Sequence, residues 1–231
     1  MRKIGITCLI VLTGMFLLIG APSRAAEGNP GTPCPSSQWV SQEASLPWPG
    51  GPEPQLAEVA TNGVMQLICC RGGENGKYMQ FPLEPGTPVL IDYQQAGWAC
   101  GYATTSTGGG SGWIRSNALH KISFNLEPPL KAWTGTWAGE EDTVVIHKGA
   151  APGTLSVNGS AQWHGWNGVI HGGSVDGIAS PSGNRLFLSH PQEYGCEVYM
   201  TLMGDYIVAS DNGSCGGMNV RFMGIWKRGG H

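Results

Sequence analysis

The chain has 231 residues, which is long enough for two small domains or for one large all-β domain. Charged residues make up 13% of it, about half of the usual share of roughly 25%, and 37 residues are Gly. This composition argues against helical bundles and coiled coils, and it favours many short strands joined by tight turns. The formal net charge of −3 excludes a strongly basic surface, so no nucleic acid partner is expected.

Residues 1–25 have the features of a secretory signal peptide. Two cations and an apolar run, within residues 2–19, precede Ser23-Arg24-Ala25, which has the small-x-small form of a signal-peptidase site. The apolar run is too short for a comfortable membrane span, and no second run follows it. The sequence therefore predicts a periplasmic or secreted protein that has no membrane span after cleavage. Cleavage removes three cations, so the net charge changes from −3 to −6.

The number of cysteines is consistent with export. An even number remains after residues 1–25 are removed, and exported chains tend to pair their cysteines in disulfides. These six are Cys34, Cys69, Cys70, Cys100, Cys196 and Cys215. No C-x-x-C pair is present, so we expect neither a zinc ribbon nor any other metal or cofactor. Cys196 starts one predicted strand and Cys215 follows the next, and the turn at Gly204-Asp205 folds these strands together. We therefore predict a bond between Cys196 and Cys215.

The remaining chain divides into four segments. These are a Pro-rich arm or linker at 26–60, a turn-rich β segment at 61–122, a linker at 123–131 and a second β segment at 132–228.

Short motifs follow one another along the middle segment. They comprise strand-like runs at 68–73 and 78–83, a turn at 84–89, the pairs Gly97-Trp98 and Gly112-Trp113, and a closing turn at 116–119. In this order and spacing, the segment resembles a bacterial SH3-like domain. The resemblance implies a small barrel without catalytic activity that binds cell-wall peptide or glycan, or an envelope protein. The aromatic side chains here either fill the core or line a groove for such a ligand; the candidates are Tyr78, Tyr93, Trp98 and Tyr102.

Cys69 and Cys70 are adjacent, so in a strand they point to opposite faces and need different partners. One partner is expected to be Cys100 and the other Cys34. The resemblance places Cys70 at an inward position of the SH3-like domain. It therefore predicts the pairs Cys70–Cys100 and Cys34–Cys69, and the second pair would tie the Pro-rich arm down.

The last segment reads as an eight-stranded antiparallel β-barrel. Its strand-like runs are regularly spaced, at 133–138, 143–147, 154–163, 169–179, 185–189, 196–203, 206–210 and 219–227. Gly135-Thr136-Trp137 opens the segment, and Gly224-Ile225-Trp226-Lys227-Arg228 closes it. Both motifs resemble those of calycin barrels, which are lipocalin-like or avidin-like. This resemblance implies that the last strand brings a cation over the Trp ring of the first.

Four side chains gather in a Gly-rich stretch of this segment, and they are Trp163, His164, Trp166 and His171. They form either a surface loop anchored in the barrel mouth or a recognition loop, because Trp is favoured at binding hot spots. The spacing of the two His matches no strong metal-ligand pattern. The nearby carboxylate run at residues 140–142 is typical of a solvated turn.

No catalytic motif stands out. The chain lacks a Gly-x-Ser-x-Gly elbow, a His-Glu-x-x-His motif and a phosphate loop. Cys100 and His120 are nominal peptidase candidates, but the even cysteine count argues that Cys100 is oxidised. We therefore predict a non-enzymatic extracytoplasmic binding protein. Two alternatives stay open: a protein inhibitor or immunity protein that blocks an envelope-acting hydrolase, and a small-ligand carrier that uses the barrel interior.

Overall fold

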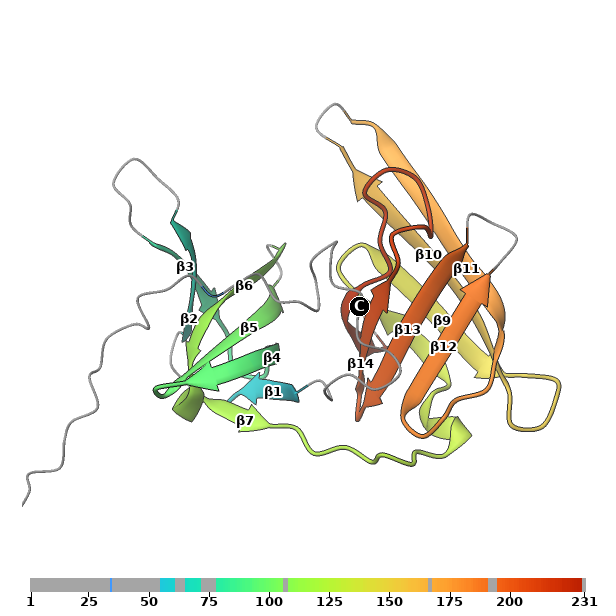
Figure 1. The fold of residues 1–231 in the computed structure, drawn as a ribbon, viewed down its shortest axis with the longest axis horizontal. Helices are drawn as coiled ribbons and strands as arrows, with labels where there is room; N and C mark the ends of the chain where they lie inside the picture. Colours follow the sequence, from blue (N-terminus) through green and yellow to red (C-terminus); the bar gives the residue numbers. More distant parts are fainter. Residues whose placement is uncertain are drawn as a thin grey trace, which may run out of the picture.

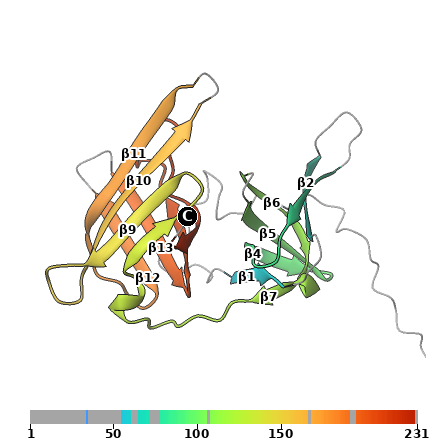
Figure 2. The ribbon, with the colours of Figure 1, turned by 180° about the vertical axis from the view of Figure 1, so that it is seen from behind.

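The computed structural model describes residue 34 and residues 55–60, 65–71, 78–105, 108–165, 168–190 and 195–229. In these ranges the chain is all-β, as the sequence predicts. Two antiparallel sheets lie side by side, and short 3-10 turns are the only helical elements described (Figures 1 and 2). Within the same ranges, no helical segment has the length and apolarity of a membrane span.

The first sheet has seven strands in the order β3-β2-β6-β5-β4-β1-β7, and it curls into a half-barrel (Figure 1). Its elements are β1 (Gln55–Val59), β2 (Met65–Arg71), β3 (Tyr78–Leu83), β4 (Pro88–Gln95), β5 (Trp98–Thr105), β6 (Gly108–Arg115), the 3-10 turn η1 (Ser116–Ala118) and β7 (Leu119–Lys121). Both predicted turns are present. Thr87 N–H donates to the carbonyl of Glu84 at 3.0 Å, with Gly86 at a φ of 82° that other residues resist, and η1 is the closing turn.

Strand β1 lies in the segment expected to be part of the Pro-rich arm. It pairs with β4 on one side and with β7 on the other. The reason is local, because the last Pro of the arm is residue 54 and the next five residues carry buried apolar side chains at Leu56, Ala57 and Val59. The sheet therefore begins at residue 55 rather than after residue 60.

The second sheet has eight strands in the order β11-β10-β9-β8-β15-β14-β13-β12 and forms a nearly closed barrel (Figure 2). A 3-10 turn, η2 (Leu130–Ala132), precedes it. The strands are β8 (Gly135–Ala138), β9 (Asp142–Lys148), β10 (Leu155–His164), β11 (Ile170–Ala179), β12 (Arg185–His190), β13 (Cys196–Met203), β14 (Tyr206–Asp211) and β15 (Gly224–Arg228). Each of the eight predicted runs thus overlaps one strand, with ends that differ by a few residues.

The last strand is shorter than predicted, because residues 219–223 are not part of it. Asn219 has a φ of 64°, in the left-handed region, so the predicted run does not begin there as extended strand. The connection between β14 and β15, residues 212–223, instead reaches β11, where Gly217 N–H donates to the carbonyl of Gly172 at 3.1 Å. It also inserts Val220 and Phe222 into the barrel core.

The barrel interior is packed with the chain's own side chains. Its largest fully buried members are Trp133, Trp137, Phe222 and Trp226. Arg228 lies over the Trp137 ring, with 4.1 Å between the guanidinium carbon and the ring centroid, so the cation–ring contact implied by the calycin resemblance is present. The guanidinium also donates to the carbonyl of Thr134 at 2.8 Å. This residue therefore links the end of the barrel sequence to its beginning.

Two disulfides are described, and one matches its prediction. Cys196–Cys215 is present and closes a separation of 19 residues along the chain. The predicted pairs Cys70–Cys100 and Cys34–Cys69 are wrong, because Cys34 is bonded to Cys100. Strand order explains the error: β6 lies between β2, which carries Cys69 and Cys70, and β5, which carries Cys100. Strands β2 and β5 are therefore two strand spacings apart, each of about 4.8 Å. This distance exceeds the roughly 7 Å that is the upper limit between two Cα atoms joined by a disulfide.

The two sheets share an apolar interface. Leu56 and Leu90, which face each other across β1 and β4, form one buried cluster with Met203, Val208 and Ile225 of the barrel. Tyr206 belongs to the same cluster, and its hydroxyl donates to a carboxylate oxygen of Glu58 at 2.8 Å. Burial of this apolar surface holds the half-barrel against the outer face of β14 and β15.

Candidate functional site

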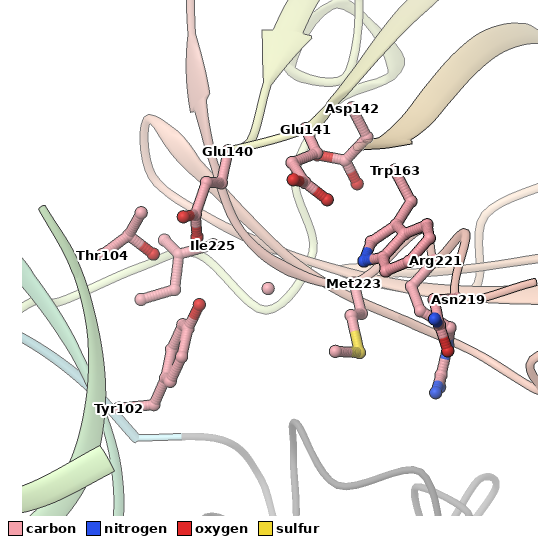
Figure 3. A pocket seen from close by; sticks show the side chains of 11 residues that line it. Tyr102, Thr104, Glu140, Glu141, Asp142, Trp163, Asn219, Arg221, Met223 and Ile225 are labelled. Carbon is pink, nitrogen blue, oxygen red and sulfur yellow. The ribbon is translucent and has the colours of Figure 1, made fainter. Parts of the chain in front are cut away.

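A cavity of about 390 Å³ lies where the two sheets meet (Figure 3). We call it the intermodule groove. Its described lining combines two residues of β5 with residues from three parts of the barrel sequence: Tyr102, Thr104, Glu140, Glu141, Asp142, Trp163, Asn219, Arg221, Met223, Gly224 and Ile225. Neither module forms this cavity alone.

The acidic wall of the groove is the turn between β8 and β9. Gly139 N–H donates to the carbonyl of Asp142 at 2.9 Å, which closes the hairpin around Glu140 and Glu141. The backbone carbonyl of Glu141 also accepts a hydrogen bond from Gln162 of β10 at 3.0 Å. The turn is therefore fixed on both sides, and Figure 3 shows the side chains of Glu140 and Glu141 directed into the cavity.

Asp142 is buried, with 6% of its surface exposed, whereas Glu140 and Glu141 are exposed, so the expectation of a solvated acidic turn is wrong for Asp142 alone. Its Oδ2 accepts a hydrogen bond from the indole nitrogen of Trp226 at 2.8 Å. Its Oδ1 is buried without a hydrogen-bond partner among the described residues. Burial raises the pKa of Asp142 to about 7, against the lowering effect of the Trp226 bond, and the charges of Asp211 and Glu141 raise it further.

Gly139 makes room for this carboxyl group. A Cβ atom at Gly139 would lie 2.0 Å from Oδ1 of Asp142 and 2.6 Å from the Trp226 ring. Both atoms are held in the barrel wall, so neither can move aside easily. The position before the acidic turn is therefore restricted to Gly, and the buried carboxyl depends on it.

The opposite side of the groove comes from the connection before β15. Arg221 lies at its base, and its Nε donates to Oδ1 of Asp211 at 2.6 Å. Asp211 is fully buried and also accepts the backbone N–H groups of Gly213 and Phe222. This network fixes the path of the segment and the positions of Asn219 and Met223 in the cavity wall.

Tyr102 of β5 closes the groove from the half-barrel side. Its ring is half-buried, and Figure 3 shows its hydroxyl directed toward Ile225 and Glu140. Burial raises the pKa of Tyr102, a hydrogen bond with Thr104 lowers it, and the charges of Glu140 and Asp142 raise it. The acidic turn therefore acts electrostatically across the groove on a residue of the other module.

Trp163 lies at the end of β10 and contributes the second aromatic ring. It pairs with His171 across the β10–β11 hairpin, with their ring centroids 5.5 Å apart. Its indole nitrogen faces the middle of the cavity (Figure 3). His164 is exposed and lies on the other side of the acidic turn, where a second hollow of about 500 Å³ is lined by residues 139–143, Ser160, Gln162 and His164.

The structure thus separates the predicted ligand-binding residues. It brings Tyr102 and Trp163 into one cavity, with His171 behind Trp163. Trp98 is instead a core residue: it is 6% exposed, packs with Cys100 and Trp113, and carries the guanidinium of Arg115 at 4.0 Å from its ring centroid. The side chains of Tyr78, Tyr93 and Trp166 lie outside the described residues.

Sequence reasoning missed the polar lining of the groove. Glu140, Glu141 and Asp142 are visible in the sequence as a carboxylate run, and the preceding Gly139 is the one local signal that this run is not an ordinary solvated turn. No local pattern around Arg221 indicates that it lines the groove, because its position is set by its contact with Asp211, ten residues earlier in the chain. Among the described residues, no group of three or more His, Cys, Asp or Glu side chains is arranged to hold a metal ion.

The groove is therefore a polar and aromatic cavity whose walls come from segments far apart in the sequence. Comparisons of the chain with protein-family models, with curated proteins and with solved structures gave no match.

Proposed function

We propose that this chain is a non-enzymatic extracytoplasmic binding protein, which holds a polypeptide segment of an envelope protein in the intermodule groove. The observation that carries the proposal is the placement of two aromatic rings, Tyr102 from the half-barrel and Trp163 from the barrel, in one cavity. Flat rings with a polar edge contribute strongly to protein recognition.

The size and construction of the cavity support this function. Its volume of about 390 Å³ falls in the range of about 300–1,000 Å³ that is typical of binding pockets. The apolar interface around Tyr206 and Ile225 holds the two modules together beside it. A preformed cavity lowers the ordering cost of binding, because the protein side does not rearrange.

The surroundings of Asp142 support binding rather than catalysis. A carboxyl group with a pKa near 7 is a common general acid or base. Here, however, Oδ2 is engaged by Trp226, and Oδ1 is buried beside Gly139. Neither oxygen is placed to exchange a proton with a ligand in the groove.

Two further features support the cellular location and the choice of site. Disulfides such as Cys34–Cys100 and Cys196–Cys215 persist in oxidising compartments, which fits an exported protein. The barrel interior is filled by its own side chains, so we place the ligand in the groove and do not propose a small-ligand carrier.

The proposal is tested by capture of envelope proteins on the disulfide-bonded protein. The double variant Tyr102→Leu with Trp163→Leu removes both rings but keeps apolar side chains. Phe187→Ala is the matched control, because Phe187 is an aromatic residue on the outer barrel surface, where it stacks on Tyr199. We expect a partner that is captured by the wild type and by the control but lost by the double variant.

Two results would overturn the proposal. Capture that is unchanged in the double variant would remove the groove from binding. Retention on protein-free peptidoglycan that depends on the two rings, without any captured protein, would replace the polypeptide partner by cell-wall material. If the captured partner is an envelope hydrolase, its activity with and without the protein decides whether this chain is an inhibitor.

A further inference from the structure

The Pro-rich arm is covalently attached to the half-barrel on the side of the groove. Cys34 is bonded to Cys100 of β5, with 5.5 Å between their Cα atoms, and it packs against the buried cluster that contains Trp98. Residues two apart lie on the same face of a strand, so Cys100, Tyr102 and Thr104 share one face of β5. The alternate residues of this strand belong to the half-barrel core. The disulfide therefore holds the arm two residues from Tyr102, which lines the groove.

The chain between this attachment and β1 is much longer than the distance that it has to cover. Gln55 pairs with Ile91 of β4, and Ile91 pairs with Gly101 of β5, so Gln55 lies two strand spacings, about 10 Å, from the strand that holds Cys34. The 20 residues 35–54, which lie outside the described residues, have an extended length of about 70 Å. Most of that length is not needed to join the two ends.

The composition of residues 35–54 suits contact with aromatic rings. They include five Pro and two Trp, and at residues 46–49 they contain the uncharged run Leu-Pro-Trp-Pro. A Trp side chain buries a large apolar area when it finds a surface to pack on. Pro-rich segments lose little conformational entropy on binding, and they dock in grooves that are lined by aromatic side chains. The run at 46–49 therefore favours an aromatic, partly apolar surface within its reach.

The intermodule groove is such a surface, and it lies on the face that carries the disulfide. The neighbouring part of this face, at Leu56 and Leu90, is already buried against the barrel. Leu90 pairs with Tyr102, so the cavity begins at the edge of that contact. Residue 49 precedes Gln55 by six residues, a reach of about 20 Å, which exceeds the distance of about 10 Å across the strands. The aromatic and apolar side chains that meet there are those of Tyr102, Trp163, Met223 and Ile225 (Figure 3).

We propose that residues 46–49 of the chain's own Pro-rich arm occupy the intermodule groove, against Tyr102 and Trp163, and that a partner has to displace them. The occupancy follows from the attachment, the length and the composition of the arm. The competition with a partner rests on the proposed function. The walls of the groove are the same in both states, and only the occupant changes. The apparent affinity for the partner is then lowered in proportion to the fraction of molecules whose groove is free.

The test is photo-cross-linking in the full, disulfide-bonded chain. Met223 in the groove wall is replaced by the photoreactive analogue p-benzoylphenylalanine, so that Tyr102 and Trp163 stay intact. After irradiation, peptide mapping by mass spectrometry identifies the segment that is joined to position 223, and we expect residues 46–49 of the same chain. The same analogue in place of Phe187 is the matched control. Phe187 lies on the outer barrel surface, where it stacks on Tyr199, and should give none of this product.

The double variant Leu46→Ser with Trp48→Ser removes the apolar side chains of the run and leaves the groove unaltered. We expect it to shift the NMR resonance of the Trp163 indole N–H and to reduce the cross-link. Partner capture should strengthen at least about twofold, which is the change from a half-occupied to a free groove. Ser37→Ala with Ser41→Ala is the control, because it changes two arm residues outside the run and should leave all three readouts as they are.

A cross-link from position 223 only to other segments, or a Trp163 resonance that the double variant does not move, would overturn the inference. In that case, a partner capture that still depends on Tyr102 and Trp163 keeps the proposed function. A cross-link to residues 46–49 together with capture that is independent of both rings has the opposite meaning, because it removes the proposed function and keeps the arm in the groove. Capture that the double variant does not strengthen would remove the competition.

Discussion

Replacement of Asp142 by Asn should flatten the dependence of stability on pH. The carboxyl group has a pKa of about 7 in the fold against 3.8 for the free side chain, so the folded protein binds more protons than the unfolded chain between these values. The free energy of unfolding therefore falls as pH rises from about 4 to about 7. At about 1.4 kcal/mol per pKa unit, this loss amounts to about 4 kcal/mol.

The variant Asp142→Asn keeps an oxygen for the indole N–H of Trp226 and cannot ionise. Its amide N–H₂ takes the place of the oxygen beside Gly139, and a buried donor without a partner costs about 1–2 kcal/mol. At pH 4.5 the wild type has already lost about 1 kcal/mol, so we expect the variant to be less stable by no more than about 1 kcal/mol there, and more stable by about 2–3 kcal/mol at pH 8.

Urea unfolding of both proteins, with disulfides intact, at four pH values from 4.5 to 8 measures this difference. Glu84→Gln is the control, because an exposed carboxylate should leave the wild-type slope unchanged. Parallel curves for Asp142→Asn and the wild type would refute the reasoning, since they would show that Asp142 does not titrate differently in the fold.

Three further outcomes follow from the packing. Replacement of Cys196 and Cys215 by Ser should lower the free energy of unfolding by about 3 kcal/mol, as the entropy of closing a 19-residue separation predicts, which denaturant unfolding measures. Tyr206→Phe loses the hydrogen bond to Glu58 and should weaken the intermodule contact by about 1 kcal/mol, seen as faster proteolysis in the linker. Gly173→Ala places a Cβ 2.4 Å from the carbonyl of Cys215 and should cost about 1–3 kcal/mol, which a thermal melt detects.

Much of the fold was predictable because its signals are local. Alternating apolar residues such as Val144 and Ile146 mark a strand, and a turn residue such as Gly204, at a φ of 67°, marks the following hairpin. These signals need only a few neighbouring residues. They fail at residues 219–223, where the apolar alternation of Val220 and Phe222 reflects insertion into the barrel rather than membership of a strand.

The disulfide partner of Cys100 and the groove were not predictable in the same way. Strand β6 separates β2 from β5, and no local pattern reports an order of strands that differs from their order in the sequence. The groove has the same character, because Tyr102, Glu141, Trp163 and Arg221 come from four separate stretches of chain. Two of its aromatic residues could be proposed from their type, but their common location depends on the contact between modules.

The connection at residues 212–223 makes the structure of the groove wall depend on disulfide formation. It carries Arg221 and Asn219 into the groove wall, and the Cys196–Cys215 bond anchors it to the start of β13. A chain in a reducing compartment would lack this anchor. If the groove binds as proposed, its wall would be completed only once the disulfide has formed, so that binding would follow oxidation rather than synthesis.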